Sequence, residues 1–458
     1  MVFSSISYIY YFLTFAIITY FLVPRKLKNI VLLAFSLFFY YYGEKQLVIL
    51  LVFSIVFNYF YAKIIEKYHS RKVLTLGVVV NILLLVYFKY TNFFIDNISK
   101  LFNLNIHFTK IVLPIGISFF TFQGLSYLVD VYRRDVKASG SLINFGAYLS
   151  FFGQLIAGPI VRYETISKEI DDRKETSEEF VIGFNRFAIG LFKKSVIANI
   201  LGELVNIMAG LTSKSVVSYW LEALASTLQL YFDFSAYSDM AIGMGLIFGF
   251  HFLENFNYPL WANSITDFWR KWHISLSSWF KDYVYIPLGG SRCSKKRQIF
   301  NIMCVWFLTG FWHGADWNFI IWGLYFGIIL IIEKQFLLKY FNSHIVLGRL
   351  ITFIMVNLGF VIFNHNISEM GIYFSSMFGL NKLPFINVET IYYLRSYLVI
   401  ILLSLFLMTP YFKEFIIKLY KKYPIINNFR IVVIVLLILI STAYLVDASF
   451  NPFLYFRF

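Results

Sequence analysis

The run ISYIYYFLTFAIITYFLV, from Ile6 to Val23, contains no charged residue. Similar apolar runs recur along the chain, as far as IVVIVLLILISTAYLV from Ile431 to Val446. They lack the alternation of apolar and polar residues that marks membrane barrel strands, and a backbone in lipid must satisfy its own hydrogen bonds. Because a helix needs roughly 20 apolar residues to cross a bilayer, the sequence predicts an all-α polytopic transmembrane helical bundle of about eleven spans, some of them re-entrant.

The overall composition supports a membrane protein. Apolar residues make up 59% of the 458 residues and charged residues only 14%, whereas soluble domains carry about a quarter charged residues. The formal net charge of +15 is concentrated in short loops such as PRKLKN (24–29) and YRRDVK (132–137). This pattern is typical of positive-inside topology and contact with anionic lipid, and not of nucleic-acid binding. No long linker or repeat is present, so we expect one integral-membrane domain over residues 1–458.

Several kinds of chemistry find no support in the sequence. The only cysteines are Cys293 and Cys304, and no cysteine or histidine pair has zinc-finger spacing. Walker loops, HExxH motifs and GxSxG nucleophile elbows are also missing. We therefore expect no bound metal and no bound cofactor.

One histidine lies inside an apolar run, in LTGFWHGADWNFIIWG from Leu308 to Gly323. An ionisable residue within a membrane span is costly and by default suggests function, although a packed neutral histidine is the alternative for His313. If residues 312–322 are helical, Asp316 follows His313 by three residues on the same face. The carboxylate could then fix the tautomer of the ring, leaving the other nitrogen of His313 as a general base for a hydroxyl proton.

A second histidine, His273, lies in DFWRKWHISLSSWFKDYVYIPLGG, from Asp267 to Gly290. Its tryptophan neighbours fit an amphipathic helix at the membrane interface equally well, so a purely interfacial role stays open. Arg270 and Lys271 precede it, and basic side chains are natural partners for phosphate groups.

Long strings of this sequence resemble the membrane-bound O-acyltransferase (MBOAT) family, in its bacterial alginate and peptidoglycan O-acetyltransferase-like branch. They are LPIGISFFTFQGLSYLVDVYR (113–133), FFGQLIAGPIVRY (151–163), YFDFSAYSDMAIG (231–243), NFNYPLWANSITDFWRKWH (255–273), the segment 268–290 that contains His273, LTGFWHGADWNFIIWGL (308–324) and NPFLYFRF (451–458). The resemblance implies acyl transfer in a central tunnel through the membrane, with His313 as the catalytic histidine of one signature and His273 as the histidine of the other. It also implies that a cytoplasmic acyl thioester meets an extracytoplasmic hydroxyl. With such a donor, we expect His273 to support the same site by orienting the acyl donor or the transition-state oxygen, and Arg270 and Lys271 to meet the phosphates of the donor.

The function expected from this resemblance is O-acetylation of a cell-envelope polysaccharide, such as alginate, peptidoglycan, capsule or exopolysaccharide. The expected donor is acetyl-CoA, used as a substrate, and the expected location is the bacterial cytoplasmic (inner) membrane. An extracytoplasmic acetyltransferase- or esterase-like partner protein is expected to complete the transfer. Two alternatives stay open: D-alanyl transfer to teichoic acid by the same fold, and a proton-coupled transporter or flippase.

The C-terminal NPFLYFRF (451–458) follows the last apolar run. The basic stretch before that run predicts that the run begins on the cytoplasmic side of the membrane. The C-terminal segment that follows the run is therefore expected outside the cytoplasm. Its aromatic residues fit either anchoring at the membrane interface or docking of the partner protein.

Overall fold

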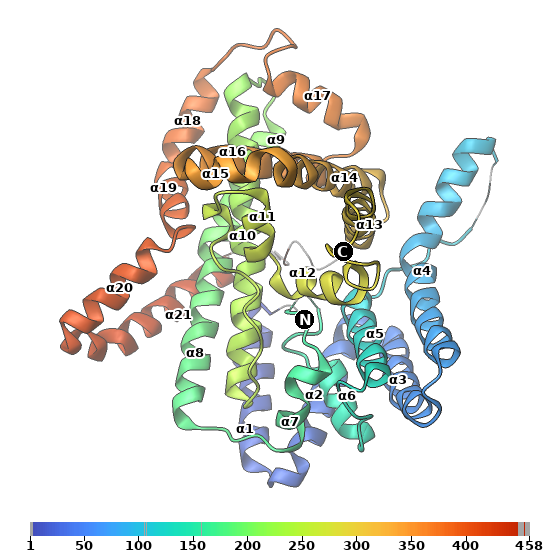
Figure 1. The fold of residues 1–458 in the computed structure, drawn as a ribbon. Helices are drawn as coiled ribbons and strands as arrows, with labels where there is room; N and C mark the ends of the chain where they lie inside the picture. Colours follow the sequence, from blue (N-terminus) through green and yellow to red (C-terminus); the bar gives the residue numbers. More distant parts are fainter. Residues whose placement is uncertain (1–2, 105, 107, 157, 448–452, 454–458) are drawn as a thin grey trace. The chain divides into compact units, whose positions relative to one another are not determined.

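The computed structural model describes residues 3–104, 106, 108–156, 158–447 and 453, and in these the regular secondary structure is helical throughout (Figure 1). The described chain divides into two compact units. Unit 1 comprises residues 1–187, 237–254 and 452–458, and unit 2 comprises residues 188–236 and 255–451. Helices α8 (Ser177–Phe192) and α10 (Val216–Ile247) contribute residues to both units. The all-α fold is confirmed, and the single domain stays a prediction.

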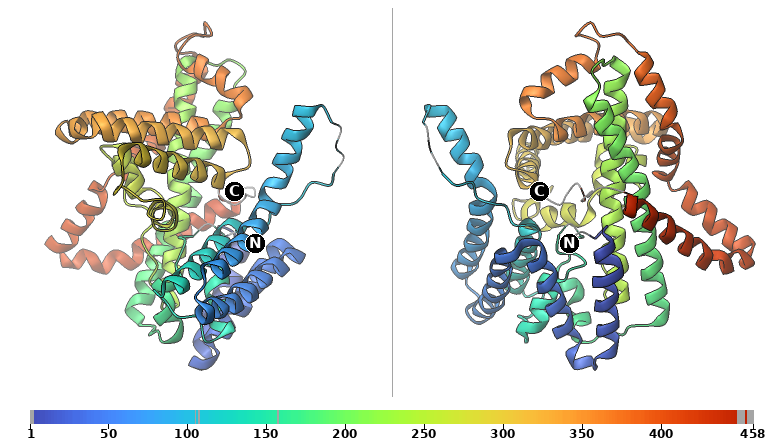
Figure 2. Two further views of the ribbon diagram at one scale, coloured as in Figure 1. Left: turned by 45° about the vertical axis from the view of Figure 1, so that its right-hand side comes forward. Right: turned by 180° about the vertical axis from the view of Figure 1, so that it is seen from behind.

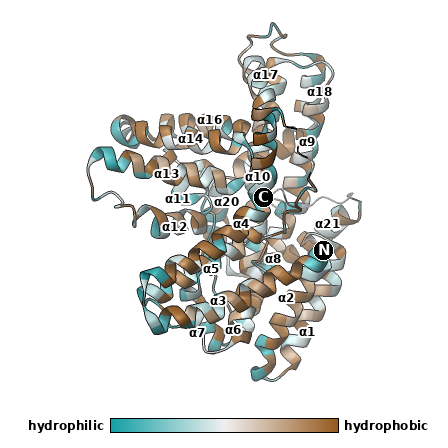
Figure 3. Ribbon diagram, turned by 90° about the vertical axis from the view of Figure 1, so that its right-hand side faces the viewer, coloured by the Kyte–Doolittle hydropathy of each residue, from teal (hydrophilic) through white to brown (hydrophobic). Residues whose placement is uncertain are grey.

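Five helices among the described residues are long and apolar enough to cross a membrane, or six if one bent pair counts as a single span. They occupy Arg25–Tyr68, Arg71–Phe102, Trp317–Ser343, Ile345–Asn364 and Arg430–Asp447, and the bent pair is Val388–Ser396 with Leu398–Leu407. This is fewer than the sequence predicts, because other apolar runs are short helices, such as Ser7–Leu22. Figure 3 shows the apolar residues that predominate along α2 and α4. The protein is a multi-pass membrane protein.

In unit 1, helices that are not consecutive in the chain pack against one another. Helix α3 lies against α5 and α6, α4 lies against α5, and α2 lies against α6 (Figure 2). Asn58 of α3 and Asn81 of α4 exchange side-chain amide hydrogen bonds of 3.2 and 2.9 Å where both are buried. Such bonds hold helices together in lipid, where apolar contact alone gives little preference for protein over lipid. The elements of this unit are η1 (Ser7–Leu13), α1 (Thr14–Leu22), η2 (Arg25–Leu27), α2 (Lys28–Glu44), η3 (Lys45–Leu47), α3 (Val48–Tyr68), α4 (Arg71–Phe102), α5 (Ile117–Arg133), α6 (Leu142–Ser150) and α7 (Tyr163–Asp171).

The predicted C-terminal segment is represented in the structure by Phe453 alone. Phe453 is buried, and its ring lies edge-on to that of Tyr237 at 4.9 Å between centroids, within unit 1. The rest of residues 451–458 lies outside the described residues, so the predicted docking role stays a prediction.

Unit 2 contains the two signature histidines and is built around the hairpin of α13 (Lys295–His313) and α14 (Trp317–Ile332), which also packs against α16 (Ile345–Asn364). Two short helices precede the hairpin, α11 (Ile265–Lys271) and α12 (Ile274–Phe280). The remaining elements are η4 (Lys193–Ala198), α9 (Asn199–Gly210), η5 (Pro259–Trp261), η6 (Lys281–Tyr285), η7 (Glu333–Leu337), α15 (Leu338–Ser343), α17 (Ile367–Met377), α18 (Val388–Ser396), α19 (Leu398–Leu407), α20 (Tyr411–Lys422), η8 (Pro424–Phe429) and α21 (Arg430–Asp447).

Two glycines allow α13 and α14 to approach closely. A Cβ at Gly310 would collide with the backbone oxygen of Phe319, and a Cβ at Gly323 with that of Trp306. Small residues at helix crossings are the usual means of close packing in membranes. This packing matters for the site because Gly310 lies one turn before His313.

Replacing Gly310 with alanine should therefore destabilise the protein. The added methyl group meets backbone, which cannot move aside cheaply, and overpacking of this kind costs about 1–3 kcal/mol. Gly371 in α17 is the matched control, because nothing lies within 4 Å of its added Cβ, and alanine there should be neutral or stabilising by up to about 1 kcal/mol. Thermal unfolding of the detergent-solubilised variants measures both changes. A Gly310→Ala protein that is as stable as Gly371→Ala would contradict the close crossing.

Candidate active site

The two signature histidines lie around one tryptophan in unit 2. His313 is the last residue of α13 and His273 is the residue before α12. Both are buried, with 2% and 1% of their surface exposed. The ring of Trp312 lies 4.9 Å from that of His313 and 6.3 Å from that of His273, centroid to centroid. The structure therefore brings together the two histidines that the sequence singled out.

His313 is enclosed by aromatic rings. Trp322 of α14 and Phe363 of α16 lie edge-on to it at 4.9 and 5.4 Å. Asn318 is buried beside them and donates a hydrogen bond of 2.7 Å to the backbone oxygen of Phe363, which ties α14 to α16. Rings on several sides hold the imidazole of His313 in a fixed orientation and separate it from bulk water.

Residues 312–322 do not form one continuous helix, which was the condition for the expected contact between Asp316 and His313. Helix α13 ends at His313, Gly314 is extended, and Asp316 is the N-cap of α14. The carboxylate of Asp316 accepts a hydrogen bond of 2.6 Å from the backbone N–H of Trp317. Aspartate is a favoured N-cap because it satisfies an N–H that the helix leaves without a partner. The i,i+3 spacing therefore no longer supports a role for Asp316 in fixing the tautomer of His313.

His273 has polar partners that the sequence analysis did not assign. Its Nδ1 lies 3.1 Å from Oδ1 of Asn255, and the same oxygen accepts a hydrogen bond of 2.9 Å from Oγ of Ser275. On another side, the ring of Phe234 in α10 lies edge-on at 4.7 Å. Asn255 is the first residue of the signature string 255–273, so the signal was present in the sequence without a stated role.

Burial lowers the pKa of His273, which lies outside the apolar spans, in the connection between two seven-residue helices. A buried imidazole loses the hydration that stabilises its charged form, so the neutral ring is favoured. A neutral ring is what proton abstraction from a hydroxyl requires.

The two basic residues before His273 differ in their surroundings. Arg270 is exposed, and Lys271 donates a hydrogen bond of 2.8 Å to Asp267, one turn earlier in α11. Arg270 lies close enough to Lys334 for the two positive charges to repel each other. Lys334 is a further basic residue that the sequence analysis did not consider. Both predicted donor-binding residues thus lie at the end of α11, and Trp272 separates them from His273.

A buried carboxylate holds α11 in place. Glu333 is 1% exposed and accepts hydrogen bonds from the backbone N–H groups of Ile265 and Thr266, at 2.6 and 2.8 Å. A negative charge at a helix N-terminus satisfies its free N–H groups and interacts favourably with its dipole. Glu333 thus anchors the helix that carries Arg270 and Lys271.

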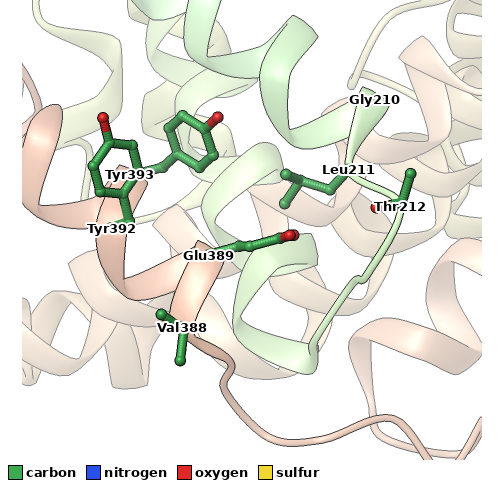
Figure 4. Close-up of a pocket in the computed structure, with 7 residues that line it drawn as sticks. All are labelled: Gly210, Leu211, Thr212, Val388, Glu389, Tyr392 and Tyr393. Carbon is green, nitrogen blue, oxygen red and sulfur yellow. The ribbon is translucent and has the colours of Figure 1, made fainter.

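A surface pocket of about 450 Å³ lies elsewhere in unit 2, between the end of α9 and α18 (Figure 4). None of the predicted site residues lines it; its lining is Gly210, Leu211, Thr212, Val388, Glu389, Tyr392 and Tyr393. Within the described residues, no group of three or more His, Cys, Asp or Glu is arranged to hold a metal ion.

Comparison with known proteins identifies the family. The family model described as MBOAT, membrane-bound O-acyltransferase family, matches residues 35–372. A protein named "Probable alginate O-acetylase AlgI" from Azotobacter vinelandii is 39% identical over 419 residues, covering 87% of this chain and 84% of that protein. "Peptidoglycan O-acetyltransferase" from Helicobacter pylori is 36% identical over 423 residues, which cover 83% of this chain and 80% of that protein. "Teichoic acid D-alanyltransferase" from Bacillus subtilis is 31% identical over 272 residues, which cover 55% of this chain and 68% of that protein.

The long apolar helices define the class of protein as a multi-pass membrane protein. The family match covers most of the chain. The chain therefore belongs to the membrane-bound O-acyltransferase family and is an O-acyltransferase.

Proposed function

We propose that this enzyme transfers an acetyl group from a cytoplasmic thioester, acetyl-CoA, to a hydroxyl group of a cell-envelope polysaccharide at the bacterial cytoplasmic membrane. The observation that carries the proposal is the burial of His273 and His313 around Trp312. The names of the relatives from Azotobacter and Helicobacter support acetyl as the acyl group and a polysaccharide as the acceptor.

The chemistry follows from what a buried imidazole can do. A neutral histidine takes the proton of the acceptor hydroxyl while the oxygen attacks the thioester carbonyl, and the leaving thiolate recovers a proton. Thioester and alcohol thereby become ester and thiol. We propose His313 and His273 as the two histidines of this centre, with Arg270 and Lys271 meeting the phosphates of the donor.

Two alternatives are less well supported. The D-alanyltransferase of Bacillus subtilis aligns with 55% of this chain, against 87% for the Azotobacter relative. Membership in an acyltransferase family decides against a proton-coupled transporter or flippase. A partner protein outside the cytoplasm remains part of the proposal, since the acceptor polymer lies there.

Deleting the gene tests the function directly. We expect the O-acetyl content of one isolated polymer, peptidoglycan, capsule or exopolysaccharide, to fall, and to recover when the wild-type gene is restored. Unchanged O-acetyl content in all three polymers would contradict the proposal. A loss of D-alanyl esters from teichoic acid would favour the alternative acyl group.

A further inference from the structure

His251 lies in the segment that follows α10, between glutamates of two other helices of unit 1. Its Nδ1 is 2.8 Å from Oε1 of Glu169 in α7, and its Nε2 is 3.1 Å from Oε1 of Glu179 in the first turn of α8. The backbone N–H of His251 also donates to Oε2 of Glu169, at 3.0 Å. One histidine therefore connects α7, α8 and the segment after α10.

The two contacts of this ring require two hydrogens. An ionised carboxylate has no hydrogen to donate, so both glutamate oxygens can only accept. A neutral imidazole carries one hydrogen, and its other nitrogen would turn a lone pair towards the second oxygen. Both contacts are therefore satisfied only when the cluster holds one more hydrogen. The ring of His251 takes it, because the ordinary pKa of histidine, about 6.5, lies above that of glutamate, about 4.3.

The surroundings of His251 favour the charged ring. Burial alone would lower its pKa, but the hydrogen bonds and charges of Glu169 and Glu179 outweigh burial and raise the pKa of His251 above its ordinary value. The side chain is 53% exposed, so its proton exchanges with water. A group whose pKa is raised by folding stabilises the fold below its ordinary pKa, here about 6.5, and this contribution is lost as the pH rises through the raised pKa.

The other charged groups around residues 248–254 have partners of their own. Arg173 donates to the backbone oxygen of Phe248 at 2.9 Å. The ion pairs are Lys28 with Glu175 at 2.9 Å, and Arg186 with Asp239 and Glu254 at 3.0 and 2.5 Å. The charges in direct contact with the ring of His251 are those of Glu169 and Glu179.

This cluster faces the cytoplasm. The segment between α7 and α8 forms ion pairs with the loop at residues 24–29, between Arg25 and Asp172 and between Lys28 and Glu175. The positive-inside rule places that basic loop on the cytoplasmic side. The proton on His251 is therefore in equilibrium with the cytoplasm.

We propose that His251 is a proton-dependent link, which joins the first turn of α8 to α7 at low cytoplasmic pH and releases it at high pH. The contact with Glu179 is the one that is lost, because Glu169 keeps its bond to the backbone N–H of His251 at either pH. Within the described residues, Oε2 of Glu179 is buried without a hydrogen-bond partner, so this carboxylate depends on the charged ring. The inference goes beyond acyl transfer and does not depend on the acyl group or the acceptor.

The variant Glu179→Gln separates the proton from the contact. An amide accepts from a charged ring and donates to a neutral one, so this variant keeps the link at every pH. Glu178→Gln is the matched control, because it removes the same charge from an exposed position one residue away. His251→Gln is a second variant, which has no group that titrates at this position.

Trypsin cleavage between α7 and α8, at residues 172–176, measures the release. Inverted membrane vesicles that contain the full-length chain expose this segment, in which Lys174 is exposed. Cleavage follows the population of the open form when opening is fast. Between pH 6.5 and 8.5, the cleavage rate of the wild type relative to Glu179→Gln should rise about 2- to 5-fold, as expected for an exposed ion pair. Dividing by the rate of Glu179→Gln removes the pH dependence of trypsin itself.

The control variants decide the interpretation. Glu178→Gln should show the same rise as the wild type, and His251→Gln should show none. If Glu179→Gln does not reach wild-type abundance, His251→Gln replaces it as the reference. A wild-type ratio that is equal at both pH values, a rise in His251→Gln, or a loss of the rise in Glu178→Gln would overturn the proposal. Because no acyl transfer is measured, the result is independent of the proposed function.

Discussion

Alanine in place of His313 is expected to reduce acetyl transfer by about 10²- to 10⁴-fold, the range for loss of an acid–base group, or by more if the ring also positions the acceptor. The reason is its place in the site: His313 is buried and shares Trp312 with His273. His313→Asn provides a second variant, which fills more of the space than alanine but has no imidazole to exchange a proton. Transfer of label from acetyl-labelled acetyl-CoA to polysaccharide, in membrane vesicles that contain the full-length chain, measures the activity directly, and the O-acetyl content of the polymer measures it in the cell.

The control for this experiment is a histidine outside the site. His344 is exposed and packs on Tyr340, one turn away in the same part of the chain. Its replacement with alanine should leave transfer unchanged. If His313→Ala reaches wild-type abundance and retains near-normal acetylation, His313 has no part in the mechanism.

Replacing Lys194 with methionine should cost about 3–5 kcal/mol of stability, the range for removing one partner of a buried ion pair. Lys194 lies in the π-helical segment η4 and Asp233 in α10, with Nζ and Oδ1 2.6 Å apart and both side chains 2% exposed or less. Methionine keeps the approximate length of the side chain but removes the ammonium group that lies 2.6 Å from the carboxylate of Asp233. Phe234, which contacts His273, follows Asp233 directly, so transfer should fall as well.

The double variant Lys194→Met with Asp233→Leu is the control. Replacing a buried pair by apolar residues is often nearly neutral, so the double variant should regain much of the lost stability. Thermal unfolding in detergent compares the double variant with the two single variants, Lys194→Met and Asp233→Leu. If the double variant is destabilised by the sum of the two single losses, the pair does not act as a unit.

The local features of this protein could be read from the sequence because they depend on residues close together in the chain. Long apolar runs become helices suited to a bilayer, and this holds for residues 71–102 and 345–364 whatever surrounds them. His313 stood out because an ionisable side chain in an apolar run is costly. The sequence also contains the residues that separate α13 from α14, Gly314 as the C-cap of one helix and Asp316 as the N-cap of the next.

The relation between residues far apart in the chain was decided by the tertiary structure. Asn255 and His273 are separated by 18 positions and meet because two backbone hydrogen bonds join their loops. Glu333 reaches the N-terminus of α11 across 68 positions. Trp312 lies against both histidines only because the α13–α14 hairpin packs beside the connection between α11 and α12. Helical periodicity sets which residues share a face of one helix, but it says nothing of which loop closes on which, because that depends on the packing of side chains from several elements at once.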